Sequence, residues 1–181
     1  MQDHSDISFI GHHKILVTAQ VVETAINLMF VTFFLGVLNL KTGALSYTNA
    51  GHNPPLLLTG NHAEELECDA NIPVGVMEGW TFSVQQLLMK PGDTLFLYTD
   101  GLNEAENCDY EQFDMDRIKA TIRQVSGGVP QQRAIDSQKL ISVMTEAVKH
   151  FAGEAEQSDD LTMLAIGYNG NENDKQTTIV Q

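Results

Sequence analysis

The most constraining feature of this sequence is a short apolar run that stops at an aspartate–glycine pair. Residues 94–98, Thr-Leu-Phe-Leu-Tyr, are apolar or β-prone throughout, which predicts a buried strand. Thr99, Asp100 and Gly101 follow directly. Glycine lets the backbone turn sharply and leaves room for a ligand to approach the carboxylate. The pattern therefore has two interpretations, a plain turn or a carboxylate held at a strand end as a metal ligand.

The charge of the chain limits the partners that it can bind. The 181 residues include 10 Lys and Arg against 24 Asp and Glu, which gives a net charge of -14. This balance disfavours nucleic acid and anionic lipid, because their phosphates would be repelled. It is compatible with bound cations or with a basic protein partner.

Cysteine content and hydropathy indicate the compartment. Cys68 and Cys108 are too few for a disulfide framework and lack the spacing of a zinc site. The longest apolar run, residues 28–38, is too short to cross a bilayer. No basic stretch followed by an apolar one opens the chain. We therefore expect a cytoplasmic protein that does not insert into membranes.

The patterning along the chain predicts a helix, a meander of strands, two helices and a last strand. Residues 1–12 are polar and mixed, which indicates a frayed start. Residues 13–28 carry apolar side chains at three- and four-residue steps, which predicts a helix. Elements that group in this way predict an α+β fold, in one domain over residues 1–168 with a polar tail over 169–181. The further predicted strands are 29–40, 44–50, 56–58, 64–67, 81–88 and 161–168, and the further helices are 115–125 and 131–151.

A second acidic motif stands near the other end of the chain. Asp159 and Asp160 precede the predicted strand at 161–168, and the intervening helices could return the chain to the edge where Asp100 lies. Carboxylates that meet at one sheet edge form a hard, oxygen-rich site that suits Mg²⁺ or Mn²⁺. The alternative is a solvated loop leading into a strand, and composition alone favours that alternative.

Four segments, taken in order, resemble one known family. They are Met-Phe-Val-Thr at 29–32, Asn-Ala-Gly-His-Asn-Pro-Pro-Leu at 49–56, Leu-Tyr-Thr-Asp-Gly at 97–101 with Glu-Ala at 104–105, and Asp-Asp-Leu-Thr at 159–162. Together they resemble the SpoIIE-type branch of the metal-dependent type 2C protein serine/threonine phosphatases. The turns at 73–76 and 90–93 agree with the family as well.

The resemblance implies both an architecture and an activity. The expected fold is a type 2C phosphatase-like β-sandwich packed with helices. The expected reaction removes phosphate from phosphoserine or phosphothreonine of a bacterial regulatory protein, in the partner switching that controls sigma factors. It would use two Mn²⁺ or Mg²⁺ ions and a metal-bound water as nucleophile, without a covalent phosphoenzyme.

The resemblance also assigns residues. Asp100 and Asp159 match metal-binding aspartates of the family, and Asp160 takes a supporting or alternative role. Gly101 matches the glycine that lets the site close. A characteristic loop, whose role is expected to be structural before catalytic, is matched by Gly51, His52 and Asn53.

One family motif is absent from the sequence. Family members carry an earlier Asp-x-x-Gly-His-Gly element whose aspartate bridges the two metals. The nearest fragment here is Gly-His-His at 11–13, and Ser8 stands where the aspartate is expected. Because a bridging carboxylate serves both cations, its loss would leave one weak site or none.

The missing motif keeps two hypotheses open. The first is an active phosphatase. The second is a catalytically impaired or truncated phosphatase-like domain that serves in protein–protein interaction. The short leading stretch predicts that the first strands of the sandwich are missing. The sheet edge exposed in that way could pair with a second copy of the chain as a homodimer.

Overall fold

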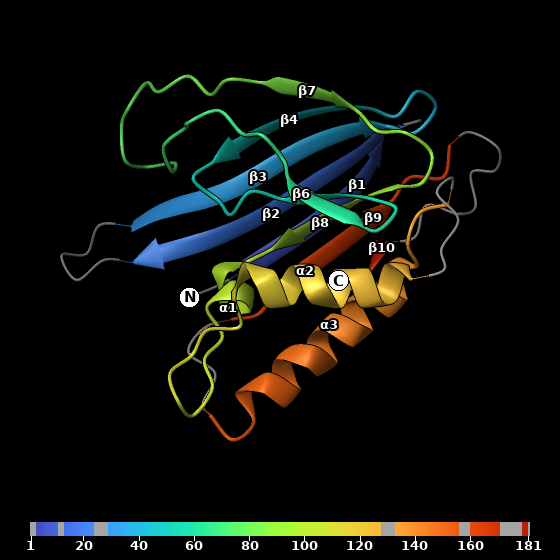
Figure 1. Cartoon of the computed structure of the whole chain (residues 1–181). Helices are drawn as coiled ribbons and strands as arrows, with labels where there is room; N and C mark the ends of the chain where they lie inside the picture. Colours follow the sequence, from blue (N-terminus) through green and yellow to red (C-terminus); the bar gives the residue numbers. More distant parts are fainter. Residues whose placement is uncertain are drawn as a thin grey trace.

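The described part of the chain folds into three layers. The structure is a computed structural model, and it describes residues 3–10, 13–23, 29–127, 133–155, 160–170 and 179–180. Within these residues, two five-stranded sheets pack face to face, and helices cover the outer face of the second sheet (Figure 1). The predicted α+β class and the predicted sandwich packed with helices are confirmed.

The first sheet is antiparallel throughout, in the order β1-β2-β3-β4-β7. Two of its strands, β3 and β4, confirm the strands predicted at 29–40 and 44–50. The strand predicted at 81–88 is shorter than expected and forms only β7. The strands are β1 Asp3–Ile10, β2 His13–Glu23, β3 Met29–Asn39, β4 Ala44–Ala50 and β7 Gln85–Leu88.

The helix predicted over residues 13–28 is wrong, because residues 13–23 form β2. This strand pairs with β3 along its whole length, from His13 opposite Asn39 to Glu23 opposite Met29. Its apolar residues satisfy the helical spacing, but many of them are β-branched and therefore favour a strand. The predicted frayed start also differs, since β1 pairs with β2 over all eight of its residues. Residues 24–28 lie outside the described part.

The second sheet has the order β10-β9-β8-β5-β6 and is also antiparallel. Its centre is β8, which confirms the buried strand predicted at 94–98. Residues 171–178 of the predicted polar tail lie outside the described part, and the two residues after them form β10. The strands are β5 Leu56–Thr59, β6 His62–Glu65, β8 Asp93–Tyr98, β9 Met163–Gly167 and β10 Ile179–Val180.

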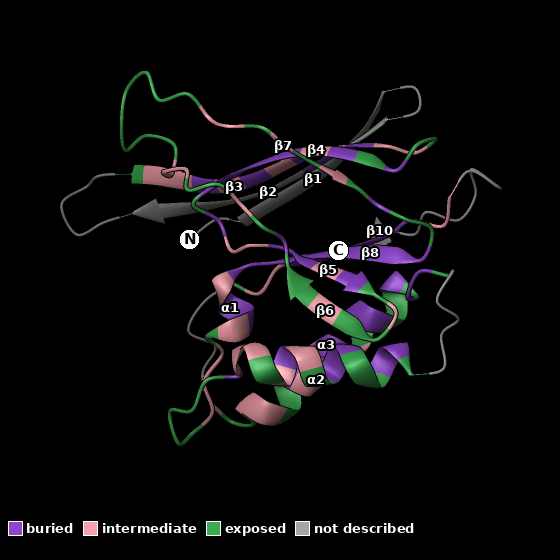
Figure 2. Ribbon diagram, turned by 45° about the horizontal axis from the view of Figure 1, so that its top comes forward, coloured by how far each residue is buried: buried purple, intermediate pink, exposed green. Residues whose placement is uncertain are grey.

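The second sheet is the middle layer, and this explains why β8 is apolar without alternation. All six residues of β8 are buried (Figure 2). Leu95 and Leu97 belong to the core between the two sheets. Phe96 and Tyr98 belong to the core between the second sheet and the helices. A strand with apolar layers on both faces needs apolar residues at every position.

The helices are α1 Asp100–Asn103, α2 Asp114–Ser126 and α3 Ser137–Ala152. The aspartate–glycine pair after β8 therefore opens a short helix rather than a plain turn. The prediction placed α3 from residue 131, but its start is defined by Asp136, whose carboxylate accepts the backbone N–H groups of Gln138 and Lys139. No helix in the described ranges has both the length and the apolar composition needed to cross a membrane.

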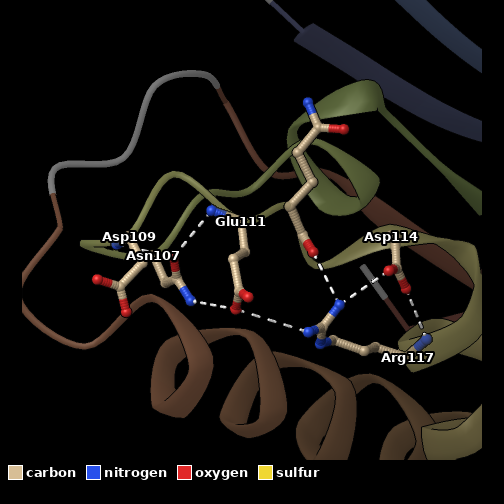
Figure 3. A network of polar contacts seen from close by, with 6 residues as sticks. Asn107, Asp109, Glu111, Asp114 and Arg117 are labelled. Atoms are coloured by element: carbon tan, nitrogen blue, oxygen red, sulfur yellow. Dashed lines mark hydrogen bonds and ion pairs between the residues drawn. The ribbon is translucent and has the colours of Figure 1, made fainter.

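The loop between α1 and α2 is held by polar contacts around Arg117 (Figure 3). The guanidinium donates to Asp114 at 2.8 Å and lies 3.8 Å from the carboxylate of Glu111. Asn107 in turn donates to Glu111 at 3.0 Å. The guanidinium also lies 4.7 Å from the ring centroid of Phe151 on α3. These contacts connect the chain that leaves α1 to both longer helices.

Candidate functional site

The end of β8 is joined to the start of β9 by the side chain of Thr99. Its hydroxyl donates to the carbonyl oxygen of Asp160 at 3.0 Å and accepts the backbone N–H of Thr162 at 3.0 Å. The backbone N–H of Thr99 donates to the carbonyl of Thr162 at 3.0 Å. Thr99 is fully buried. The backbone segments that carry Asp100 and Asp160 therefore lie side by side at one edge of the second sheet.

The predicted metal ligands differ in how the structure describes them. Asp100 is half-buried at the first position of α1, and Asp160 is exposed just before β9. Asp159 lies outside the described residues. Gly101 is buried within α1, next to the fully buried Leu102. The roles assigned to these residues stay predictions.

The loop at residues 51–53 is shaped by Asn49 and Gly51. The Asn49 side chain donates to the His52 carbonyl at 2.8 Å and accepts the His52 backbone N–H at 2.8 Å. Gly51 has φ +72°, and a Cβ at this position would come within 2.7 Å of Cγ of Pro73. Only glycine meets both demands without strain. The conformation that this loop imposes fixes where the His52 side chain lies.

His52 is buried, with 5% of the residue exposed. Its Nδ1 lies 3.4 Å from Oγ1 of Thr32 on β3. Its Nε2 has no hydrogen-bond partner among the described residues. Burial lowers the pKa of His52 to about 4, against the opposing effect of the Asp100 charge. The imidazole is therefore neutral at pH 7, and Asp100 lies within electrostatic range of it.

A contact between two asparagines links this loop to α1. Asn53 donates to the side-chain oxygen of Asn103 at 2.9 Å. Because α1 begins at Asp100, the contact brings the loop at 51–53 and the carboxylate of Asp100 to the same end of the molecule. The structure thus groups sequence-predicted residues from two segments of the chain, which the contact between Asn53 and Asn103 joins across 50 positions.

Four polar residues that support this end of the molecule were not predicted. They are Thr32, Asn49, Thr99 and Asn103. Two of them, Thr32 and Asn49, are buried within β3 and β4. A buried polar side chain needs a partner, so this placement was the available sequence signal.

The side-chain oxygen atoms at this edge of the second sheet are of the type that binds a hard divalent cation. Asp100 and Asp160 supply carboxylate oxygens, which suit Mg²⁺ or Mn²⁺ and not the softer metals. Within the described ranges, however, no group of three or more His, Cys, Asp or Glu side chains is placed to hold a metal. Asp159, the third predicted ligand, lies outside those ranges.

Comparison with known families covers nearly the whole chain. The family model described as stage II sporulation protein E (SpoIIE) matches residues 10–169. The chain belongs to the SpoIIE family. The matched range contains the loop at 51–53 and both acidic motifs. Among curated relatives, Protein IcfG of Synechocystis sp. is 33% identical to this chain over 138 residues. That match covers 76% of this chain and 20% of IcfG, so the chain spans about a fifth of that relative.

Solved structures show that this SpoIIE-family chain has the type 2C phosphatase fold. The RsbU and RsbW domains of a Mycobacterium tuberculosis protein match with a TM-score of 0.75 at 20% identity, over 94% of this chain and 57% of that chain. The PP2C phosphatase domain of Bacillus subtilis SpoIIE, solved with a fragment of its regulatory domain, matches at 0.70 and 15% identity, over 90% and 57%. RsbX in complex with magnesium matches at 0.58 and 11% identity, over 90% and 85%. The chain thus shares the fold of these solved phosphatase domains.

Proposed function

We propose that this SpoIIE-family chain is a metal-dependent phosphatase for phosphoserine or phosphothreonine. Its substrate would be a cytoplasmic regulatory phosphoprotein of a bacterial partner-switching system that controls a sigma factor. The observation that carries the proposal is the Thr99 contact, which holds the backbone of Asp100 beside that of Asp160 at one sheet edge. Family membership supports the reaction class.

Electrostatics supports the requirement for a cation. Asp100 and Asp160 are acidic residues in a chain of net charge -14, so a phosphate dianion would be repelled from this edge. Asp100 and Asp159, with Asp160 in a supporting or alternative role, would hold Mn²⁺ or Mg²⁺. When bound, such an ion neutralises phosphoryl charge and lowers the pKa of a bound water. The magnesium complex of RsbX, which shares the fold, supports this choice of ion.

The residues of this chain would prepare the site. Thr99 fixes the spacing of the two acidic segments through its three backbone partners. Gly101 carries no side chain that would obstruct approach to Asp100. Asn53 and Asn103 hold the loop at 51–53 against α1 and so keep that end of the molecule closed.

Hydrolysis of p-nitrophenyl phosphate and of a phosphoserine peptide tests the proposal. We expect turnover that requires added Mn²⁺, disappears with EDTA and is lost in Asp100→Asn. The variant keeps the size of the side chain and one acceptor oxygen, and it removes the charge. Turnover no greater than that of Asp100→Asn would contradict the proposal for this chain.

A second candidate function is a non-catalytic domain that binds another protein or a second copy of itself. It rests on the absent Asp-x-x-Gly-His-Gly motif and on an exposed apolar segment. Residues 70–89 carry only one charged side chain, Glu78. Exposed apolar surface of this extent marks interaction sites. Its exposed large side chains are Val74, Val76, Met77, Trp80, Val84 and Leu88.

Calorimetric titration with Mn²⁺ separates the two functions. Tight binding of two ions would argue against the non-catalytic candidate. Sedimentation velocity at increasing protein concentration would detect a homodimer. Trp80 is the single tryptophan of the chain, so its fluorescence would report whether the apolar segment is covered on association.

A further inference from the structure

The two ring nitrogens of His52 have different surroundings. Nδ1 lies 3.4 Å from the Thr32 hydroxyl. Nε2 is buried and has no hydrogen-bond partner among the described residues. Buried polar atoms are nearly always paired in native proteins, so an exception points to a partner of another kind.

The loop around His52 prevents the ring from moving to find a different partner. Two hydrogen bonds of 2.8 Å connect the His52 backbone to the Asn49 side chain. The preceding residue, Gly51, packs against the ring of Pro73. The following residue, Asn53, is bound to Asn103 of α1. The backbone of His52 is thus held on both sides, and the contact of Nδ1 with Thr32 sets the direction of the ring.

The identity of the neighbouring charge decides which nitrogen carries the proton. Asp100 is the charged residue within electrostatic range of the His52 ring. His52 is almost fully buried, which favours the neutral imidazole. A neutral imidazole has one N–H and one acceptor nitrogen. A carboxylate can only accept, whereas the Thr32 hydroxyl can donate or accept. The tautomer with the proton on Nε2 satisfies both neighbours, with Thr32 donating to Nδ1.

We propose that His52 is a positioning residue for Asp100, whose carboxylate accepts a hydrogen bond from Nε2–H through one water. The proposal rests on the proposed function, because the bond would orient the Asp100 carboxylate toward a divalent cation. It assigns His52 a role beyond shaping its loop. Groups that hydrogen-bond to a metal-ligating side chain typically change metal affinity about 10- to 100-fold.

Nitrogen NMR of the histidine rings tests the tautomer without any metal. The chain has six histidines, and the His52 signals are assigned by their loss in His52→Phe. We expect the Nε2–H tautomer at pH 7, with a change in its Nε2 shift when diamagnetic Mg²⁺ is added. Detection of the Nδ1–H tautomer would overturn the proposal.

Calorimetric titration with Mn²⁺ tests the effect on the cation. We expect His52→Phe, which fills the ring position without a donor, to weaken Mn²⁺ binding about 10- to 100-fold. His52→Gln retains an N–H donor and should recover part of the affinity. The control His62→Gln, at an exposed position on β6, should bind as the wild type does.

The outcomes of the titration are distinct. Wild-type affinity in His52→Phe, or equal losses in His52→Phe and His52→Gln, would overturn the positioning role and leave the proposed function intact. Failure of the wild-type chain to bind Mn²⁺ would overturn the proposed function and the positioning role with it. Thermal unfolding without metal shows that each variant is folded. If His52→Phe is not folded, the NMR measurement on the wild-type chain decides the matter, with the His52 signals assigned by their loss in His52→Gln.

Discussion

Gly51 and Asn49 show how residues without reactive groups determine the geometry of this site. Asn49 uses its whole amide to hold the His52 backbone. Gly51 supplies a left-handed conformation and a close approach to Pro73 that a side chain would prevent. The position of the His52 ring, within electrostatic range of Asp100, therefore depends on two neighbours that carry no titratable group.

Replacement of Gly51 by alanine should destabilise the protein by two separable effects. The left-handed conformation costs about 1–2 kcal/mol in any L-residue, and the overlap with Pro73 adds about 1–3 kcal/mol. Gly79→Ala is the matched control, because Gly79 has φ +74° and open space around its Cβ position. Urea unfolding should show the larger loss in Gly51→Ala. Equal losses in the two variants would show that the Pro73 contact contributes nothing.

The buried imidazole of His52 predicts a loss of stability in acid. Its pKa falls from 6.5 to about 4 on folding, so the unfolded chain binds the proton more tightly. The contribution of the neutral His52 ring to the free energy of unfolding is fully present above pH 6.5. It is lost as the pH falls toward 4, and the loss is at most about 3 kcal/mol. Urea unfolding at pH 7.0, 5.5 and 4.5 should therefore show His52→Phe approaching the wild type in stability as the pH falls. Parallel pH profiles for the two proteins would contradict this prediction.

At the level of elements, the sequence predicts a strand well where its hydrophobic pattern fits a strand and does not fit an amphipathic helix. The unbroken apolar run of β8 and the alternation in β4 each fit a strand and not an amphipathic helix. In β2, the apolar residues fit both the helical and the strand periodicity. Long-range pairing with β3 decides that this segment forms a strand. A local pattern contains no information about such a pairing partner.

The same distinction applies to the candidate site. Asp100 could be proposed as a candidate from sequence because its signal is local, a carboxylate directly after a buried strand. The supporting contacts could not, because Thr99 and Asp160 are 61 positions apart, and Asn53 and Asn103 are 50 apart. Sequence spacing does not show which distant polar residues meet.

The contact of Thr99, which directly follows β8, should be measurable against Thr94, a buried threonine within that strand. Thr99→Val keeps the shape of the side chain but leaves the Asp160 carbonyl and the Thr162 N–H without their partner, at a cost of about 1–3 kcal/mol. In the control Thr94→Val, the replaced hydroxyl is fully buried and has no partner among the described residues. That change should be neutral or stabilising. Urea unfolding measures the stability of both variants. If Thr99→Val is as stable as Thr94→Val, the Thr99 hydroxyl does not stabilise the connection between β8 and β9.

At the scale of the whole molecule, the candidate site lies where the two sheets are connected. The loop at residues 51–55 leaves β4 of the first sheet and enters β5 of the second. Asp100 follows the central strand of the second sheet, and His52 reaches Thr32 of the first. Residues from both layers thus meet at one end of the sandwich, so a ligand bound there stabilises the packing of one sheet against the other.

Binding of Mn²⁺ should therefore raise the unfolding temperature of the whole chain. An ion at 100 times its dissociation constant stabilises the folded state by about 2.7 kcal/mol, which corresponds to about 5–10 °C for a chain of this size. Thermal unfolding with MnCl₂, and again after EDTA, measures the shift.

The net charge of -14 makes a salt control essential, because any salt reduces the repulsion among acidic groups. NaCl at matched ionic strength should reproduce that general part of the shift and no more. Asp100→Asn should show the same response to MnCl₂ as to NaCl, since it retains the screening and loses a ligand. A wild-type shift that NaCl reproduces in full would mean that Mn²⁺ acts on this chain by screening alone, which would remove the thermodynamic basis of the proposed metal centre.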